Sequence, residues 1–261
     1  MILSYACCNV PVMPLRAEPA HRSEQVSQLL FGEKAEVLAA IDGGWMHIRC
    51  AADDYEGWCK AVQLRLIPLK SYRKTTAYLS AHNNNRLITD RGEMWLPLGS
   101  DLFGMKRSTI ELPGGNGKFK GKRLSSKKTI FNDEQVSHWA FKYLHAPYQW
   151  GGRSMAGIDC SGFTQMVYKL CGKKLPRDAK DQAEAGTPVD FLQDSQCGDL
   201  AFFDNAEGRI THVGILLNPN EIIHATDTAG RVVLDRIDTG GIISITQKKR
   251  THNLRLIRRY A

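Results

Sequence analysis

One cysteine and two later histidines have the types and the order needed for covalent chemistry in this 261-residue chain. Cys160 follows Asp159 where an apolar helical pattern begins, and His212 and His224 lie in later runs of β-type residues. A thiol attacks only as thiolate, and at its ordinary pKa of about 8.5 little thiolate exists near neutrality. A helix N-terminus favours the anion, and a histidine can take its proton. The three residues therefore suggest a thiol hydrolase with a lowered thiol pKa.

Within that hypothesis His212 is the base and His224 orients it through the second ring nitrogen. Each residue also has a simpler interpretation, because a cysteine at a helix start is usually structural and single histidines are usually core or edge residues. A metal site is a further alternative, but a third ligand and ligand-like spacing are missing. The residue pattern alone leaves these alternatives open.

Helices are expected first and strands second in the last half of the chain. Three helical patterns run from Asn132 to Pro147, from Cys160 to Gly172 and from Asp178, as its cap, to Gly186. Five strand-like runs follow, at residues 199–203, 211–217, 221–225, 231–237 and 254–258. This order predicts an α+β domain over residues 132–261 with an antiparallel sheet.

The first half of the chain has the pattern of small all-β barrels. Up to residue 68, short apolar runs alternate with turns, and Asp42-Gly43-Gly44 predicts a hairpin. Residues 69–131 remain strand-like and rich in glycine, which suggests a second domain of the same kind. The glycine-rich turn at 114–117 is no phosphate loop, because no Lys-Ser/Thr pair or helix start follows it.

Charge, hydropathy and cysteine spacing limit the kinds of partner and cofactor that we expect. The formal charge of +8 raises nucleic acid as a partner, but the basic residues are spread along the chain without a nucleic-acid-binding motif. No apolar run is long enough to span a bilayer, and the N-terminus lacks an export signal. The seven cysteines show no CxxC pair or zinc spacing. We expect a cytoplasmic monomer (periplasmic if the chain is a trimmed mature form), with no metal, cofactor, nucleic acid or membrane.

Six ordered motifs resemble the NlpC-type cysteine peptidases, which have a papain-like fold and cut bacterial cell-wall peptides. They are Tyr148-Gln149-Trp150-Gly151-Gly152, Asp159-Cys160-Ser161-Gly162-Phe163, Leu175-Pro176-Arg177, Gly198-Asp199-Leu200, His212-Val213-Gly214-Ile215 and Ile223-His224-Ala225. The resemblance implies that Cys160 is the nucleophile, His212 the base and His224 the third member. It also implies that Tyr148 and a backbone N–H of Cys160 or Ser161 stabilise the oxyanion.

The first quarter of the chain resembles bacterial SH3-like domains through Gly32-Glu33, a Gly44-Trp45 strand and Gly57-Trp58. Together the two resemblances imply a γ-D-glutamyl-L-diamino acid endopeptidase of the dipeptidyl-peptidase VI type, active in peptidoglycan recycling. They imply substrate contacts from Asp178, which would bind the free amine, and from Asp159, Ser161, Glu56 and Trp58. The position after Asp178 is often serine in that group and is Ala179 here, which removes one polar contact.

The expected substrate is a murein peptide with a free N-terminal L-alanine, because by resemblance the barrel would close the groove beyond two residues. Three alternatives remain: a peptidoglycan-remodelling hydrolase on intact wall, a catalytically inert wall-binding protein, and an acyltransferase or amidase on a related scaffold. The complete Cys160, His212 and His224 set argues against the inert protein. No acyl-donor site is apparent for the transferase.

Overall fold

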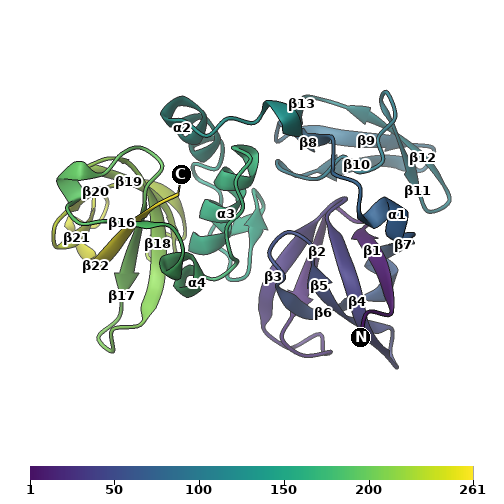
Figure 1. Cartoon of the computed structure of the whole chain (residues 1–261), viewed down its shortest axis with the longest axis horizontal. Helices are drawn as coiled ribbons and strands as arrows, with labels where there is room; N and C mark the ends of the chain where they lie inside the picture. The colour runs from purple at the N-terminus through teal and green to yellow at the C-terminus, as the bar shows by residue number, and fades with distance from the viewer. Residues whose placement is uncertain (261) are drawn as a thin grey trace. The chain divides into compact units, whose positions relative to one another are not determined.

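The computed structural model describes residues 1–260 and divides into two compact units, one of 1–129 with 153–155 and one of 130–152 with the chain from 156 onward (Figure 1). The division falls between Thr129 and Ile130. The short segment 153–155 belongs to the first unit, although the sequence predicted it within the 132–261 domain. Its Arg153 explains this, since the guanidinium forms a buried ion pair of 2.7 Å with Glu33.

The first unit begins with a seven-stranded antiparallel sheet in the order β3-β2-β6-β5-β4-β1-β7. The predicted hairpin is present, with Gly43 and Gly44 at positive φ between β4 and β5, where a side chain would be strained. The strands are β1 (Ser4–Cys8), β2 (Val12–Arg16), β3 (Gln25–Leu30), β4 (Lys34–Ile41), β5 (Trp45–Cys50), β6 (Glu56–Lys60) and β7 (Leu64–Ile67), with the short helix η1 (Ala61–Gln63) before β7.

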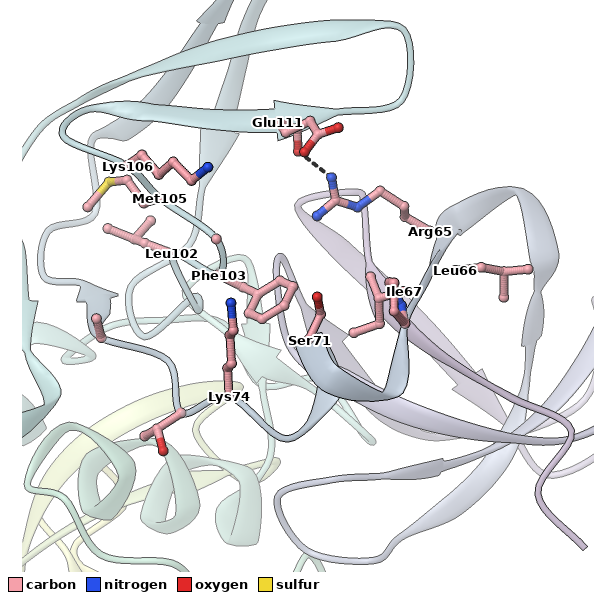
Figure 2. Close-up of a pocket in the computed structure, with 14 residues that line it drawn as sticks. Arg65, Leu66, Ile67, Ser71, Lys74, Leu102, Phe103, Met105, Lys106 and Glu111 are labelled. Carbon is pink, nitrogen blue, oxygen red and sulfur yellow. Dashed lines mark hydrogen bonds between the residues drawn. The ribbon is translucent and has the colours of Figure 1, made fainter.

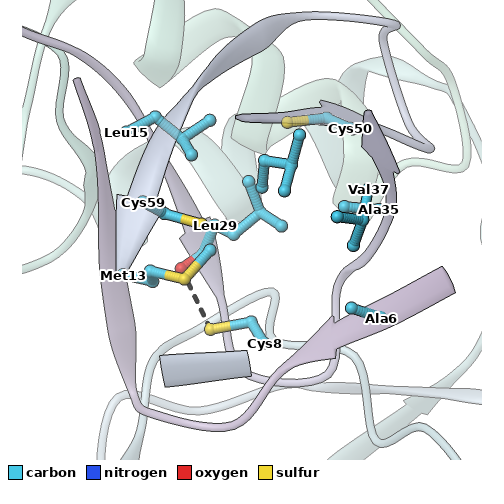
Figure 3. Close-up of a cluster of buried hydrophobic side chains, with 10 residues drawn as sticks. Ala6, Cys8, Met13, Leu15, Leu29, Ala35, Val37, Cys50 and Cys59 are labelled. Atoms are coloured by element: carbon cyan, nitrogen blue, oxygen red, sulfur yellow. Dashed lines mark hydrogen bonds between the residues drawn. The ribbon is translucent and has the colours of Figure 1, made fainter. Parts of the chain in front are cut away.

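Sulfur atoms fill much of the core of this sheet. Cys8, Cys50 and Cys59 lie in one buried cluster with Met13 and aliphatic residues (Figure 3). The Cys8 thiol donates to the carbonyl oxygens of Val10 at 3.2 Å and Leu29 at 3.5 Å. These cysteines are free, and they behave as the small buried hydrophobes that the sequence predicted.

Residues 69–129 add a short helix and six more strands. Four strands form a sheet in the order β10-β9-β12-β11, and β13 pairs with β8. Phe31, Leu87, Leu96, Ile110 and Phe119 share one buried cluster. The description of this region as a second SH3-like barrel stays a prediction. The elements are α1 (Leu69–Tyr72), β8 (Tyr78–Ser80), β9 (Asn85–Thr89), β10 (Gly92–Leu96), β11 (Thr109–Leu112), β12 (Gly115–Lys120), β13 (Arg123–Ser125) and η2 (Ser126–Lys128).

The three predicted helices are present in the second unit as α2 (Asp133–Lys142), α3 (Cys160–Leu170) and α4 (Ala179–Glu184). Asn132 caps α2 by accepting from the Gln135 N–H, and Asp159 caps α3 by accepting from the Gly162 N–H at 2.7 Å. Asp178 occupies the cap position of α4, but its side chain makes no capping hydrogen bond, so the prediction that it caps this helix was wrong. Two short strands, β14 (Arg153–Ser154) and β15 (Gly157–Ile158), precede α3.

A seven-stranded antiparallel sheet follows, in the order β16-β22-β17-β18-β19-β20-β21. Because β18, β19 and β20 are neighbours, side chains on one face of these strands lie side by side. The sequence did not predict β16 or β21. The elements are β16 (Thr187–Val189), η3 (Leu192–Asp194), β17 (Leu200–Asp204), β18 (Ile210–Asn218), β19 (Glu221–Thr226), β20 (Arg231–Asp238), β21 (Gly241–Ser244) and β22 (Lys249–Arg259). No helix within residues 1–260 is long and apolar enough to cross a membrane.

Candidate active site

Cys160 is the first residue of α3, and its side chain is buried, with 5% of its surface exposed. The backbone N–H groups of Val213 and Ser161 hydrogen-bond the sulfur. Burial nevertheless raises the pKa of the Cys160 thiol to about 12, and the Asp159 charge adds to the increase. The expectation of a lowered thiol pKa was therefore wrong, because loss of solvent outweighs the helix N-terminus and the N–H groups.

His212 on β18 and His224 on β19 are hydrogen-bonded to each other, with Nε2 of His212 2.8 Å from Nδ1 of His224. Both rings are buried. Burial first, and then the charges of His224 and His252, lower the pKa of His212 well below its ordinary value. His212 is therefore a neutral imidazole near pH 7, as a general base must be.

The thiol and the imidazole are thus both neutral before substrate binds. The Val213 N–H that reaches the Cys160 sulfur belongs to the residue after His212, which brings the predicted nucleophile to the strand that carries the predicted base. A neutral pair can still react, because the imidazole can take the proton while the sulfur attacks a carbonyl. The two N–H groups then stabilise negative charge as it develops.

Two residues around the histidines were not predicted. Asp235 on β20 is buried and lies 3.2 Å from Nε2 of His224. His252 on β22 stacks on His212, with ring centroids 4.1 Å apart and planes inclined by 25°. Asp235 could have been noticed in the sequence, because it is an aspartate within the largely apolar run 231–237. The basic run around His252 contains no sign of a role for that residue.

Tyr148 is half-buried, and its backbone N–H donates to the Gly230 carbonyl at 2.8 Å. Burial, followed by electrostatic interaction with the neighbouring Cys160 and Asp159, raises the pKa of its hydroxyl. The hydroxyl is therefore a proton donor, and no hydrogen bond occupies it within residues 1–260. Those properties suit an oxyanion donor beside Cys160, which was the predicted role of Tyr148.

Asp159 and Ser161, which flank the nucleophile, lie in a buried network with Arg177. The guanidinium reaches the Asp159 carboxylate at 2.5 Å and the Ser161 hydroxyl at 2.8 Å. Asp159 also accepts from the Gly151 N–H at 2.8 Å. These bonds hold the start of α3 in place, and the predicted substrate contacts of Asp159 and Ser161 stay predictions.

Asp178 follows Arg177 directly and is half-buried. Within the described chain its carboxylate has no hydrogen bond or ion pair closer than 4 Å. Burial raises the pKa of this carboxyl above its ordinary value. The predicted contact of Asp178 with the substrate amine stays a prediction. Because Arg177 is bonded to both neighbours of Cys160, the backbone fixes Asp178 in the same part of the second unit.

Glu56 and Trp58 lie on β6 of the first unit. The Glu56 carboxylate accepts from Arg49 at 2.8 Å and lies 3.6 Å from His47. The Trp58 ring lies against the same His47, with centroids 4.9 Å apart. The structure thus brings these two predicted contacts to one strand, and their role toward substrate stays a prediction.

A separate cavity of about 470 Å³ lies wholly in the first unit. Arg65, Lys74 and Lys106 line it beside Phe103, and Arg65 donates to the backbone carbonyl of Glu111 (Figure 2). None of its lining residues belongs to the catalytic set. Across residues 1–260, no cluster of histidine, cysteine or acidic side chains has the arrangement of a metal site.

Comparison with known proteins identifies two matching families along the chain. The NlpC/P60 family model matches residues 145–251, and the bacterial dipeptidyl-peptidase SH3 domain matches residues 15–64. The chain is 34% identical over 218 residues to a γ-D-glutamyl-L-lysine dipeptidyl-peptidase of Bacillus subtilis, covering 77% of this chain and 72% of the relative. It is 27% identical over 250 residues to dipeptidyl-peptidase 6 of Lysinibacillus sphaericus, covering 86% and 88%.

Solved structures share the fold over nearly the whole chain. The crystal structure of an NlpC/P60 family protein from Bacillus cereus superposes with a TM-score of 0.82 at 22% identity, covering 98% of this chain and 99% of the other. An NlpC/P60 endopeptidase from Photobacterium damselae has a TM-score of 0.67 at 16% identity, with 97% and 70% covered. The chain therefore has the fold of these proteins, including an SH3-like N-terminal domain.

Proposed function

Since the chain belongs to the NlpC/P60 family of cysteine peptidases and hydrolyses peptidoglycan peptides, we propose that it cuts the γ-D-glutamyl–diamino acid bond of murein peptides with a free N-terminal L-alanine. Two relatives with dipeptidyl-peptidase names support this proposal. The proposal includes peptidoglycan recycling by a cytoplasmic monomer. It also includes a papain-like, α+β assignment of the second unit, which the succession of α2–α4 and an antiparallel sheet supports.

Asp178 is the observation that carries the substrate assignment. An ammonium group that leaves water needs a carboxylate partner, because an unpaired buried charge costs several kcal/mol. Asp178 offers a half-buried carboxylate without a partner among the described residues, next to Arg177. A free α-amine of L-alanine fits this requirement, whereas an acetylated or muramyl-linked alanine has no positive charge to pair.

The proposed reaction follows from the neutral pair. Cys160 attacks the γ-carbonyl carbon of D-glutamate while His212 takes the thiol proton, and Tyr148 donates to the developing oxyanion. Collapse of the tetrahedral intermediate breaks the C–N bond, and His212 returns the proton to the leaving amine of the diamino acid. Water then hydrolyses the thioester on Cys160, which releases L-alanyl-D-glutamate with a free γ-carboxylate and restores the thiol.

The test compares L-alanyl-γ-D-glutamyl-L-lysine with its N-acetylated form, read by mass spectrometry. We expect cleavage of the free peptide and about a ten- to hundredfold lower kcat/KM for the acetylated one, since a hydrogen bond to a charged group is worth about 1.5–3 kcal/mol. Asp178→Asn should raise KM for the free peptide strongly, and Asp190→Asn, an exposed change in the same unit, should not. Equal cleavage of both peptides, or efficient digestion of intact peptidoglycan, would contradict the proposal and favour a wall-remodelling hydrolase.

A further inference from the structure

Three side chains from neighbouring strands form a continuous hydrogen-bonded chain behind the nucleophile. Asp235 on β20 contacts Nε2 of His224 on β19 at 3.2 Å, and Nδ1 of His224 contacts Nε2 of His212 on β18 at 2.8 Å. Their exposed fractions are 3%, 0% and 6%. Because solvent is excluded from these contacts, each donor must find its acceptor within the chain.

The direction of these bonds follows from the donors that each group owns. A carboxylate can only accept, so Nε2 of His224 must donate to Asp235. The other Asp235 oxygen accepts from the Ile245 N–H at 2.7 Å, which leaves one oxygen for the histidine. A neutral His224 with its proton on Nε2 has a lone pair on Nδ1, and that nitrogen accepts from Nε2–H of His212. A neutral His212 then has its lone pair on Nδ1.

We propose that Asp235 is a positioning residue that acts through His224 to hold His212 in the one neutral tautomer able to take the Cys160 proton. Nε2 of His212 is occupied by His224, so Nδ1 is the ring nitrogen left for the thiol. In the opposite tautomer Nδ1 would carry a proton and could not act as a base. The inference rests on the proposed roles of Cys160 and His212, and it adds a residue that touches neither the nucleophile nor the substrate.

The remaining titratable neighbours leave the direction of the chain unchanged. His252 on β22 stacks on the face of His212 and lies edge-on to His224, so it occupies no ring nitrogen of either residue. Its Nδ1 contacts the Thr251 hydroxyl at 2.9 Å. Asp227, in the turn after β19, acts electrostatically to raise the pKa of His252. Measurements are made at a constant pH of 7.5, where the lowered pKa values of His252 and His212 keep both rings neutral.

Asp235→Asn is the sharpest variant, because the Ile245 N–H needs an acceptor and holds the asparagine oxygen in place. The amide NH₂ then faces Nε2 of His224 and forces that nitrogen to accept. His224 must carry its proton on Nδ1 and donate to Nε2 of His212, which moves the His212 proton to Nδ1. The substitution therefore reverses both tautomers while it changes the shape of the side chain very little.

The experiment records ¹⁵N imidazole spectra of the full chain and, on the same samples, peptide cleavage and the rate at which iodoacetamide alkylates Cys160. In the wild type we expect protons on Nε2 of His212 and His224. In Asp235→Asn we expect both protons on Nδ1, kcat lower by about a thousandfold or more with KM little changed, and slower alkylation. A comparable loss follows the corresponding substitution in serine proteases. Asp238→Asn, on the same strand but paired with Arg250, is the matched control and should change none of these.

A wild-type spectrum with the His212 proton on Nδ1 would overturn the proposal without any variant, even if Asp235→Asn failed to fold. Unchanged tautomers and unchanged alkylation in a folded Asp235→Asn would also overturn it. If the wild type cleaves no murein peptide but shows the expected tautomers and the expected slowing of alkylation, the positioning role of Asp235 stands and only the substrate assignment fails.

Discussion

Cys160 and Cys59 are both buried cysteines, and they differ in their neighbours. Both thiols are nearly inaccessible, and burial raises the pKa of each to about 12. In the barrel core of the first unit, Cys59 packs among aliphatic side chains. A second thiol in the same core, that of Cys8, donates only to backbone carbonyls. In the second unit, N–H groups point at the Cys160 sulfur and a neutral histidine lies on the adjoining strand.

The resting pKa therefore does not distinguish Cys160, the predicted nucleophile, from Cys59. Backbone carbonyls beside a thiol can accept its proton in a hydrogen bond but cannot remove it, and they repel a thiolate. N–H groups and an imidazole can stabilise the thiolate and take the proton during attack. The reactive cysteine is therefore the one whose surroundings favour the product of proton transfer.

Cys160→Ala should lower the activity far more than replacement of a cysteine in the barrel core. We expect it to lower kcat/KM for peptide cleavage by at least about 10³-fold, because no other group can form the thioester. The melting temperature should change little, since the side chain contributes only a small packing surface. Activity close to that of the wild type would assign the nucleophile elsewhere.

The two histidines should differ in the size of their effects. His212→Ala removes the base, and we expect a loss close to that of Cys160→Ala, since members of such a unit act together. His224→Gln should cost less, because the amide oxygen can accept from His212 while its NH₂ donates to Asp235. Steady-state kinetics with circular dichroism as a folding check would decide this, and equal losses would require the base and orienter roles to be reassigned.

The second unit should be sensitive to acid because its histidines are buried as neutral rings. Burial lowers the pKa of His252 to about 4 and that of His212 well below 6.5. Below pH 6.5 the unfolded chain therefore binds more protons than the folded one, and stability falls as pH falls from 6.5 toward 4. The slope is up to about 1.4 kcal/mol per pH unit for each histidine.

Denaturant unfolding at several pH values measures that slope. His252→Phe keeps a ring against His212 but cannot titrate, so its stability should fall less steeply than that of the wild type. Identical slopes would mean that His252 is already protonated, or solvated, in the folded protein.

Cys59→Ala should have the smallest effect of these substitutions, and it should change stability and leave catalysis unchanged. Loss of one buried sulfur from the barrel core should lower the free energy of unfolding by about 1–2 kcal/mol, with kcat/KM unchanged once the protein is folded. Thermal unfolding beside the cleavage assay would show this. A large loss of turnover in the folded variant would break the distinction between packing cysteines and the nucleophile.

Periodicity and the residues that end each helix predicted α2, α3 and α4, because each helix has its own local signals, although Asp178 makes no capping hydrogen bond. The set Cys160, His212 and His224 came from motif order, and the structure places the two histidines in contact across neighbouring strands. Asp235 and His252 were missed because their roles depend on which strands pair, which a single sequence does not show. The raised thiol pKa was missed for a related reason, since a helix start is visible in a sequence while burial is a property of the assembled fold.

The packing of Arg153 with the first unit was also not predicted. It lies between Tyr148 and Cys160 in the sequence, yet its guanidinium is buried with Glu33 in the first unit. An ion pair between residues 120 positions apart has no local pattern that could predict it. A single sequence therefore does not show that the segment 153–155 packs with the first unit.

The central claim is that neighbours, and not exposure or resting pKa, make Cys160 the reactive thiol. Exposure alone would favour Cys197, which is the one cysteine within residues 1–260 that is not buried. The direct test follows cleavage activity during limited iodoacetamide treatment of a Cys197→Ser variant, with the modified cysteine identified by peptide mass mapping. We predict that activity falls in proportion to the fraction of Cys160 that carries the label, while Cys8, Cys50 and Cys59 stay unmodified. Activity that persists with Cys160 fully labelled, or disappears with Cys160 free, would contradict the account.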